Sequence, residues 1–200
     1  MTESTASIAA SAVISPTARI WDYAQIREGA SIGERVVIAR NVYIGPGVEV
    51  GNDSKIQNSA MLYQPALLGR GVFIGPGVIL TNDRFPRAWT PSMTQKQADD
   101  WDLVGVTVLD GASIGAGAIC VAPITVGRWS MVAAGAVVIK DVPNFGLVAG
   151  NPARQVGWVG RAGQRLIADE SNPYLFKCPA TGERYEEQMS RLLPIARADS

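Results

Sequence analysis

Hydrophobic positions recur every six residues along most of the chain. Large aliphatic residues stand at Ile8, Ile14, Ile20, Ile26, Ile32, Ile38, Ile44, Val50, Ile56, Leu62, Leu68, Ile74 and Leu80, and the pattern resumes at Val108, Ile114, Cys120, Val126, Val132 and Val138. A small or β-branched residue usually follows four places later, as in Ala24 or Val36. A period of six fits neither an α-helix nor a two-sided strand. It predicts an all-β solenoid of short strands, in which three hexads form a coil, both kinds of residue point inward, and residue n stacks beside residue n+18.

Glycine often comes directly after the large aliphatic residue, as at Gly33, Gly45, Gly51, Gly69 and Gly75. Because glycine tolerates backbone dihedrals that a Cβ would oppose, we expect these glycines to supply the dihedrals of the turns.

The period stops at Thr81 and resumes only after about Val104. A segment of this length is too long for a turn, and long loops in compact domains are usually functional or disordered. The segment contains Arg84, Arg87 and Trp89, so we expect the loop to be ordered by packing against another surface. We expect the loop to wall a cleft between a polar-ligand site and a cofactor groove.

Stacking by 18 residues gathers polar side chains around Trp21 on one face. They are Asp22, Tyr23, Gln25, Asn41, Tyr43, Gln57 and Asn58. Amides and phenols hydrogen-bond a neutral polar ligand, and aromatic rings supply a stacking surface. The alternative is a solvated face. The outward apolar residues Met61, Phe73 and Ile79 favour contact with another subunit.

A second group of columns, after the break, carries almost no side chains. Gly115-Ala116-Gly117 is expected beside Ala133-Ala134-Gly135, and that stretch beside Asn151-Pro152-Ala153. Exposed backbone N–H and C=O groups suit a long thin ligand with amides, such as pantetheine. Lys140 and Arg154, with Arg161 and Arg165, are candidates for its phosphates. The alternative is that small residues merely satisfy tight turns.

Composition excludes several classes of function. The chain has 200 residues, with 18 basic and 18 acidic side chains, so it lacks the basic excess of a nucleic-acid-binding protein. No apolar run reaches the roughly 18–20 residues of a membrane span, and the start of the chain lacks the basic region of a signal peptide. Cys120 and Cys178 predict reduced thiols in a cytoplasmic protein. Histidine is absent, so the commonest general base and metal ligand are missing, and we expect no metal.

Several stretches of the chain resemble, in the same order, those of a known family. They are "RIWDYAQI", "NVYIGPGVEVG", "KIQNSAMLY", "GVFIGPGVILTND", "VLDGASIGAGAICVAPITVG", "VAGNPARQVGWV" and "KCPATGERY". The family that they resemble comprises the hexapeptide-repeat nucleotide-sugar N-acetyltransferases of bacterial surface-polysaccharide synthesis. The nearest branch acetylates the 3-amino group of UDP-2-acetamido-3-amino-2,3-dideoxy-glucuronate, on the way to the diacetamido-mannuronic acid of lipopolysaccharide O-antigen.

The resemblance implies a left-handed parallel β-helix over residues 1–160, interrupted by a loop at about 82–104, and a C-terminal helix or hairpin tail over 161–200. It also implies acetyl-CoA as co-substrate, a UDP-amino-sugar as acceptor, and a homotrimer with active sites between subunits.

Mapped by motif, the resemblance implies that Asn82 holds the sugar amine, that Asp83 assists electrostatically, and that Arg84 or Arg87 binds the carboxylate or the diphosphate. Relatives often have histidines where this chain has Asp22 and Gln25, which puts any role of those histidines in doubt. Since an amine near pKa 8 needs no strong base, the missing histidine favours N- over O-acetylation. Two alternatives stay open: an acetyltransferase for another nucleotide sugar or a hydroxyl, and a non-catalytic assembly subunit.

Overall fold

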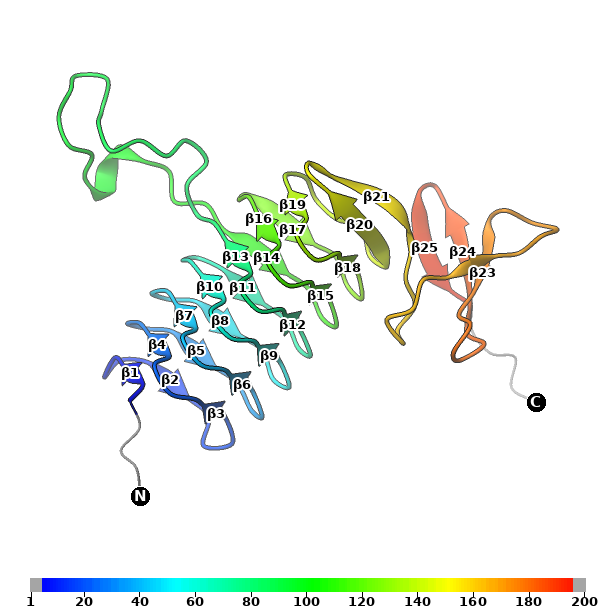
Figure 1. Ribbon diagram of the computed structural model, residues 1–200, viewed down its shortest axis with the longest axis horizontal. Helices are drawn as coiled ribbons and strands as arrows, with labels where there is room; N and C mark the ends of the chain where they lie inside the picture. The colour runs from blue at the N-terminus through cyan, green and yellow to red at the C-terminus, as the bar shows by residue number, and fades with distance from the viewer. Residues whose placement is uncertain (1–4, 196–200) are drawn as a thin grey trace.

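The chain forms a parallel β-helix followed by a small antiparallel sheet, as the computed structural model in Figure 1 shows. The structure describes residues 5–195, so the outermost residues of both predicted domains, 1–4 and 196–200, lie outside it. Three parallel sheets run along the axis, each built from every third strand. The prediction of an all-β, left-handed parallel β-helix is confirmed. In residues 5–195 no helix is long and apolar enough to cross a bilayer.

The first sheet has seven strands, one from each coil. They are β1 (Ser7–Ile8), β4 (Gln25–Ile26), β7 (Tyr43–Ile44), β10 (Met61–Leu62), β13 (Ile79–Leu80), β16 (Ile119–Cys120) and β19 (Val137–Val138).

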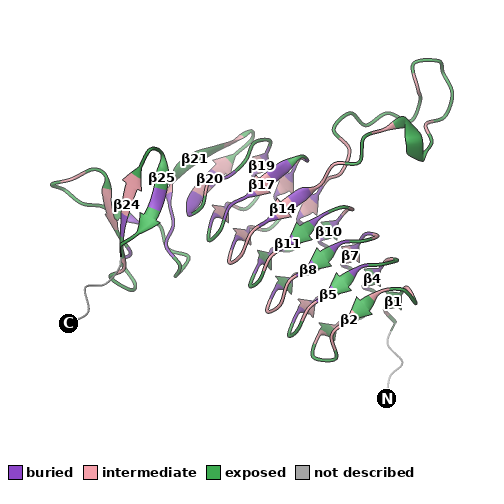
Figure 2. Ribbon diagram, turned by 180° about the vertical axis from the view of Figure 1, so that it is seen from behind, coloured by how far each residue is buried: buried purple, intermediate pink, exposed green. Residues whose placement is uncertain are grey.

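The second sheet has six strands and lies nearest the viewer in Figure 2. They are β2 (Val13–Ile14), β5 (Ser31–Ile32), β8 (Glu49–Val50), β11 (Leu67–Leu68), β14 (Val106–Val108) and β17 (Ile124–Val126).

The third sheet has eight strands and ends in an antiparallel hairpin. They are β3 (Arg19–Ile20), β6 (Val37–Ile38), β9 (Lys55–Ile56), β12 (Phe73–Ile74), β15 (Ser113–Ile114), β18 (Met131–Val132), β20 (Gly146–Gly150) and β21 (Ala153–Trp158).

The predicted register holds through the first four coils. Ser7 pairs with Gln25, and Gln25 pairs with Tyr43, as stacking by 18 requires. Two places differ. The loop adds residues between Leu68 and its partner Val108, and the last coil is two residues shorter, so Val132 pairs with Val148.

The inward residues form one continuous core along the axis. From Ile26 to Val138 the large aliphatic positions are at most 4% exposed, and the small positions from Ala24 to Val78 are buried as well. Each buried aliphatic side chain contributes about 1.5–3 kcal/mol. Ile8 departs from the expectation and is 45% exposed, because β1 is the edge strand of the first sheet and pairs only with β4 within residues 5–195.

One small inward position is polar and is fully satisfied. The Ser54 hydroxyl donates to the Gly69 carbonyl over 3.1 Å and accepts from the Val72 N–H over 3.0 Å. A serine can therefore replace alanine or valine there without leaving an unpaired buried group.

The prediction that these glycines supply the unusual dihedrals of the turns was wrong. Gly45 and Gly75 do not have positive φ angles; instead, a Cβ on either would lie 2.9 Å or less from a backbone nitrogen of the next coil. These positions need glycine because adjacent backbones approach too closely for a side chain. The left-handed residue of each turn comes two places later.

Three sets of turns form the corners of the helix. Corner one joins the third sheet to the first, through residues 21–24, 39–42, 57–60, 75–78, 115–118 and 133–136. Corner two joins the first sheet to the second, and the long loop is inserted there, between β13 and β14. Corner three joins the second sheet to the third.

Corner three carries a ladder of charges between coils. Asp53 accepts from Arg35 Nε over 2.6 Å and from Arg70 Nε over 2.9 Å. The bonded guanidinium of Arg35, then that of Arg70, holds the pKa of the Asp53 carboxyl below its usual value. These charged groups pair with one another, so we interpret this part of corner three as a structural feature and not as a binding site.

The tail consists of strands and contains no helix within residues 161–195. It is a four-stranded antiparallel sheet of β22 (Ile167–Ala168), β23 (Leu175–Lys177), β24 (Arg184–Gln188) and β25 (Arg191–Pro194). Phe145 and Trp158 pack with Leu166, Cys178 and Tyr185 in a second core. The tail sheet therefore packs against the end of the β-helix, and Cys178 serves packing. Both cysteines are free and buried.

Candidate functional site

Corner one holds most of the polar group and the column of small residues that the sequence singled out. Asp22, Tyr23, Asn41, Gln57 and Asn58 lie on its first three turns, whereas Gln25 and Tyr43 lie on the outer surface of the first sheet. The residues with almost no side chains, Gly115–Gly117 and Ala133–Gly135, continue the same corner, and we call them the smooth stretch. The Gly135 N–H donates to the Ala116 carbonyl over 2.9 Å, so these two turns stack as predicted.

One residue in each corner-one turn has a left-handed backbone. The φ angles are 60° at Tyr23, 58° at Asn41, 60° at Ser59, 66° at Gly77, 67° at Gly117 and 69° at Gly135. The corner therefore changes from turns with side chains at this position to turns with glycine, without any change in backbone shape. Backbone geometry allows side chains here, although glycine adopts it at less cost.

The smooth stretch is only partly explained by tight turns. A Cβ on Gly115 would lie 2.5 Å from the Ala134 nitrogen, so this glycine has a steric reason. Ala116 and Ala134 have none, since both are exposed and the same position holds Asp22, Arg40 and Asn58 in earlier coils. Small side chains at Ala116 and Ala134 keep the surface low where the fold permits large ones.

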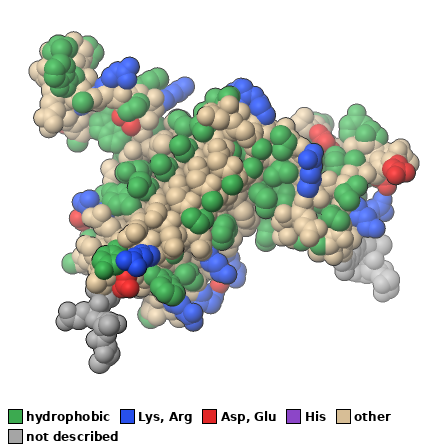
Figure 3. Space-filling model, in the orientation of Figure 1, with side chains coloured by type: hydrophobic (Ala, Val, Ile, Leu, Met, Phe, Trp, Pro, Cys, Tyr) green, Lys and Arg blue, Asp and Glu red, His purple; other side chains and the backbone are tan. Residues whose placement is uncertain are grey.

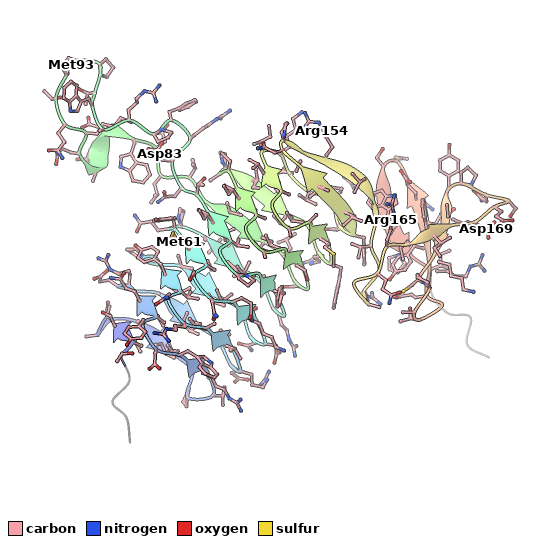
Figure 4. The ribbon with its side chains drawn as sticks, viewed as in Figure 1. Met61, Asp83, Met93, Arg154, Arg165 and Asp169 are labelled. Carbon is pink, nitrogen blue, oxygen red and sulfur yellow. The ribbon has the colours of Figure 1, made fainter. Side chains whose placement is uncertain are left out.

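The prediction that Asn151 and Pro152 extend this column was wrong. Because the last coil is two residues shorter, Ala149 and Gly150 take those places, and Asn151-Pro152 forms the turn between β20 and β21. Arg154 follows on β21 near that turn, as Figure 4 shows, and is exposed. Lys140 follows β19 and lies on corner two, away from Arg154.

The other two basic candidates already have partners. Arg161 forms an ion pair with Glu183 over 2.9 Å, and Arg165 Nη2 donates to the Val156 carbonyl over 2.6 Å. Of the four basic residues, Arg154 is the one that stays near the smooth stretch without an ion pair among the described residues.

The long loop projects away from the body of the β-helix in Figure 1. At its neck the Val104 N–H donates to the Asn82 carbonyl over 3.3 Å, and Asp83 Oδ1 accepts from the Phe85 N–H over 2.7 Å. The loop contains one short 3-10 helix, η1 (Ala98–Asp100), and an antiparallel bridge between Trp89 and Gln95. It is an ordered arm held by its own hydrogen bonds.

A pocket of about 240 Å³ lies at the base of this arm, between the arm and the turn before β17. It is lined by Asp83, Arg84, Phe85, Lys96, Asp100, Trp101, Asp102, Val104 and Pro123. Arg87 and Phe85 are exposed, and the Arg84 guanidinium lies 5.4 Å from the centre of the Phe85 ring. Of the four loop candidates, Asp83 and Arg84 line this pocket, whereas Asn82, Arg87 and all the corner-one candidates are absent from its lining.

Within a single chain, the loop does not wall a cleft between the polar group and the smooth group. The polar and smooth groups share corner one, while the loop leaves from corner two, and the first sheet lies between these corners. In Figure 3 a band of backbone and uncharged polar side chains crosses the middle of the visible face, with the loop standing off at one end. In one chain, the loop and corner one therefore lie on opposite edges of the first sheet.

A second pocket, of about 480 Å³, lies on corner one. Its lining is Trp21, Asp22, Val37, Ala39, Arg40, Gln57 and Asn58. Sequence reasoning did not name Arg40 as a site residue, although it stands in the same column as Asp22 and Asn58. Its guanidinium lies 4.6 Å from the centre of the Tyr23 ring, a cation–π contact. Reading the column in full would have found it.

The described residues contain no cluster of His, Cys, Asp and Glu that could hold a metal ion. Cys120 lies in the core, where burial raises the pKa of its thiol to about 12. It is therefore a packing residue and not a nucleophile at neutral pH.

Comparison with known proteins identifies the repeat. Residues 11–46 match the bacterial transferase hexapeptide (six repeats), and residues 29–64 and 104–140 match the hexapeptide repeat of succinyl-transferase. The 3-N-acetyltransferase for dTDP-3-amino-3,6-dideoxy-α-D-galactopyranose from Aneurinibacillus thermoaerophilus is 40% identical over 79 residues, which cover 40% of this chain and 39% of that protein. The serine acetyltransferase of Bacillus subtilis is 40% identical over 67 residues, 34% of this chain and 31% of that protein.

Among solved structures, a histidine-to-alanine variant of GDP-perosamine N-acetyltransferase from Caulobacter crescentus, in complex with CoA and GDP-perosamine, is 26% identical with a TM-score of 0.51. The match covers 77% of this chain and 57% of that one. The chain thus spans less than two thirds of the length of these relatives. It carries the hexapeptide repeat of bacterial transferases, and its relatives include nucleotide-sugar N-acetyltransferases.

Proposed function

We propose that this chain is an acetyl-CoA-dependent N-acetyltransferase acting on a nucleotide-linked amino sugar. The acceptor we propose is the 3-amino group of UDP-2-acetamido-3-amino-2,3-dideoxy-glucuronate, for lipopolysaccharide O-antigen. The observation that carries the proposal is the smooth stretch of corner one, where Ala116 and Ala134 stay small without a steric reason. The named activities of the relatives support the same class of reaction.

The acetyl-CoA arm would lie along the smooth stretch. Its amides can hydrogen-bond exposed backbone groups there, and Arg154 stands near the end of that stretch for a phosphate. A neutral arm needs shape and hydrogen bonds more than charge, which fits a surface of glycine and alanine.

The reaction would join a loop and a corner from different subunits. Asn82 and Asp83 stand at the neck of the loop on corner two, and the polar and smooth groups occupy corner one. A ring of three chains, each presenting its loop to the corner of the next, would complete three equivalent sites. The exposed apolar side chains of the first and third sheets, Met61 (39% exposed) and Phe73 (39%), suit burial between such subunits.

In the proposed mechanism the sugar amine attacks the thioester carbonyl carbon directly. Asn82 Oδ1 accepts one amine N–H and aims the nitrogen lone pair at that carbon. The C–N bond forms, the C–S bond of the tetrahedral intermediate breaks, and coenzyme A leaves as a thiolate. The ammonium proton passes finally to this thiolate, so products are the amide and free thiol.

This chemistry does not require a histidine, and the chain has none. An amine of pKa near 8 is appreciably neutral at pH 7. Positioning alone can supply about 7–11 kcal/mol in favourable cases. A hydroxyl acceptor, as in serine acetylation, must lose its proton during attack and would need a base. The second candidate, O-acetylation, therefore rests on the serine acetyltransferase match alone.

Replacing Ala134 by tryptophan tests the groove. The variant is expected to raise the KM for acetyl-CoA at least ten-fold, because a large side chain would stand where the arm lies, while kcat at saturation changes little. Ala10→Trp is the matched control, since Ala10 is exposed at the corresponding turn position of corner two in the first coil. A folded Ala134→Trp variant with the wild-type KM would remove acetyl-CoA from this stretch.

A further inference from the structure

The corner-one pocket has the shape of a slot. Trp21, Ala39 and Gln57 occupy the same turn position in three successive coils, and all three line the pocket. Adjacent coils lie roughly 4.8 Å apart, so Trp21 and Gln57 are separated by about twice that distance. Because Ala39 is small, the space above it stays open. A planar ring between two neighbours at about 3.5–4.0 Å from each needs roughly 7–8 Å, which this gap provides.

The rim of the slot carries one negative and one positive group that do not pair with each other. Asp22 and Arg40 are neighbours in the next column and both line the pocket. Within residues 5–195 neither forms an ion pair within 4.0 Å. Asp22 Oδ1 accepts from the Thr5 hydroxyl over 3.1 Å, and among residues 5–195 no donor is bound to Oδ2. The guanidinium of Arg40 lies over the Tyr23 ring, and its N–H groups donate to no other group in the described part of the chain.

The far wall offers amides. In the part of the chain that the structure describes, the side chains of Gln57 and Asn58 form no hydrogen bond with protein groups. Each amide presents one acceptor and two N–H donors, which matches the mixed edge of a nucleobase. The slot therefore combines a stacking ring, unpaired amides, a carboxylate and a guanidinium.

We infer that this slot binds the nucleoside diphosphate part of the acceptor, with the base against Trp21, the ribose hydroxyls on Asp22 and the diphosphate on Arg40. This inference rests on the proposed function only where it assigns the bound nucleotide to the amino-sugar acceptor. A carboxylate accepts well from the two hydroxyls of an unmodified ribose. It repels a phosphate, so it disfavours coenzyme A, whose ribose carries a phosphate on its 3′ oxygen.

The inference makes Asp22 a specificity-determining residue. A ribose gives the carboxylate two donors, and a 2′-deoxyribose gives it one. Hydrogen bonds to charged groups are strong enough to change affinity about ten-fold or more. The protein is therefore expected to prefer ribonucleotides to their 2′-deoxy counterparts.

The test is nucleotide binding to the full-length protein, measured by calorimetry without acetyl-CoA. The probes are UDP, GDP and ADP, each beside its 2′-deoxy counterpart, and adenosine 3′,5′-bisphosphate as the mimic of coenzyme A. We expect at least one ribonucleoside diphosphate to bind, about ten-fold more weakly to Trp21→Ala, because stacking on an aromatic ring contributes substantially per base. Asp22→Ala should reduce the preference for ribose over deoxyribose to near one.

Matched controls separate binding from stability. Trp129→Ala removes a tryptophan 37% exposed on corner three, and Glu49→Ala removes an exposed carboxylate from the second sheet. Both are expected to bind nucleotide as the wild type does. Circular dichroism and size-exclusion chromatography confirm that each variant is folded.

Three results would overturn the slot: no diphosphate binds, Trp21→Ala binds all of them normally, or the variants weaken only adenosine 3′,5′-bisphosphate. The last would place coenzyme A there. The proposed function fails separately. A protein with slot-dependent binding and no acetyl transfer keeps the slot, whereas an active transferase with nucleotide binding unaffected by Trp21→Ala keeps the function and rejects the slot.

Discussion

Replacing Asn82 by alanine is expected to lower kcat about 100-fold or more while the KM for acetyl-CoA changes less than about three-fold. Asn82 stands at the neck of the loop, where its backbone carbonyl accepts from the Val104 N–H, so the backbone that carries its side chain is anchored. Removing one positioned polar group from a reacting centre typically costs about 10²–10³ in rate. Steady-state kinetics with varied acetyl-CoA separate this effect from binding.

Gln95→Ala is the control for the loop, since Gln95 is exposed and its pairing with Trp89 is made by backbone. It should leave kcat near the wild-type value. Mixed assemblies add a second measure. Asn82→Ala alters the loop and Asn58→Ala alters corner one, so co-assembled variants regain activity if each site takes these parts from different chains. Unchanged turnover in Asn82→Ala would remove Asn82 from the mechanism.

Replacing Leu68 by alanine is expected to lower the free energy of unfolding by about 2–5 kcal/mol, the usual cost of deleting a large buried aliphatic side chain. Leu68 is 4% exposed and lies inside the β-helix, where coils on both sides leave little room to collapse around the cavity.

Its neighbour Leu67 is an internal control. It belongs to the same strand, β11, but faces outward and is 41% exposed. Leu67→Ala should change the free energy of unfolding by about 0.5 kcal/mol in either direction. Urea unfolding at one fixed protein concentration measures both, because assembly would make stability concentration-dependent. Equal losses for the two variants would contradict the assigned direction of the side chains.

The six-residue period predicted the coils because large residues that recur every six positions can all be buried inside a three-sided coil. A large aliphatic residue such as Ile44 is buried, and the residue six places later points inward from the next side of the three-sided coil. The same period fixed the stacking of Ala116 beside Ala134. Local burial therefore determines both the fold and most of the candidate columns.

Features set by a change in the period were not predictable in the same way. Two residues are missing from the last coil, and hydrophobicity alone did not reveal that Val132 pairs with Val148. This moved Asn151 and Pro152 out of the smooth stretch. The direction of the loop and the sheet of the tail depend on contacts of Phe145 and Trp158 with distant segments, which have no repeat.

The proposed acceptor can be tested most directly by thiol release from acetyl-CoA. The acceptors are the 3-amino UDP-uronate, UDP-N-acetylglucosamine as the amine-free control, and L-serine as the acceptor of the alternative reaction. We expect thiol release with the amino sugar alone, and an amide in the product by mass spectrometry. Release with serine, or silence with the amino sugar from a folded protein that binds acetyl-CoA, would contradict it.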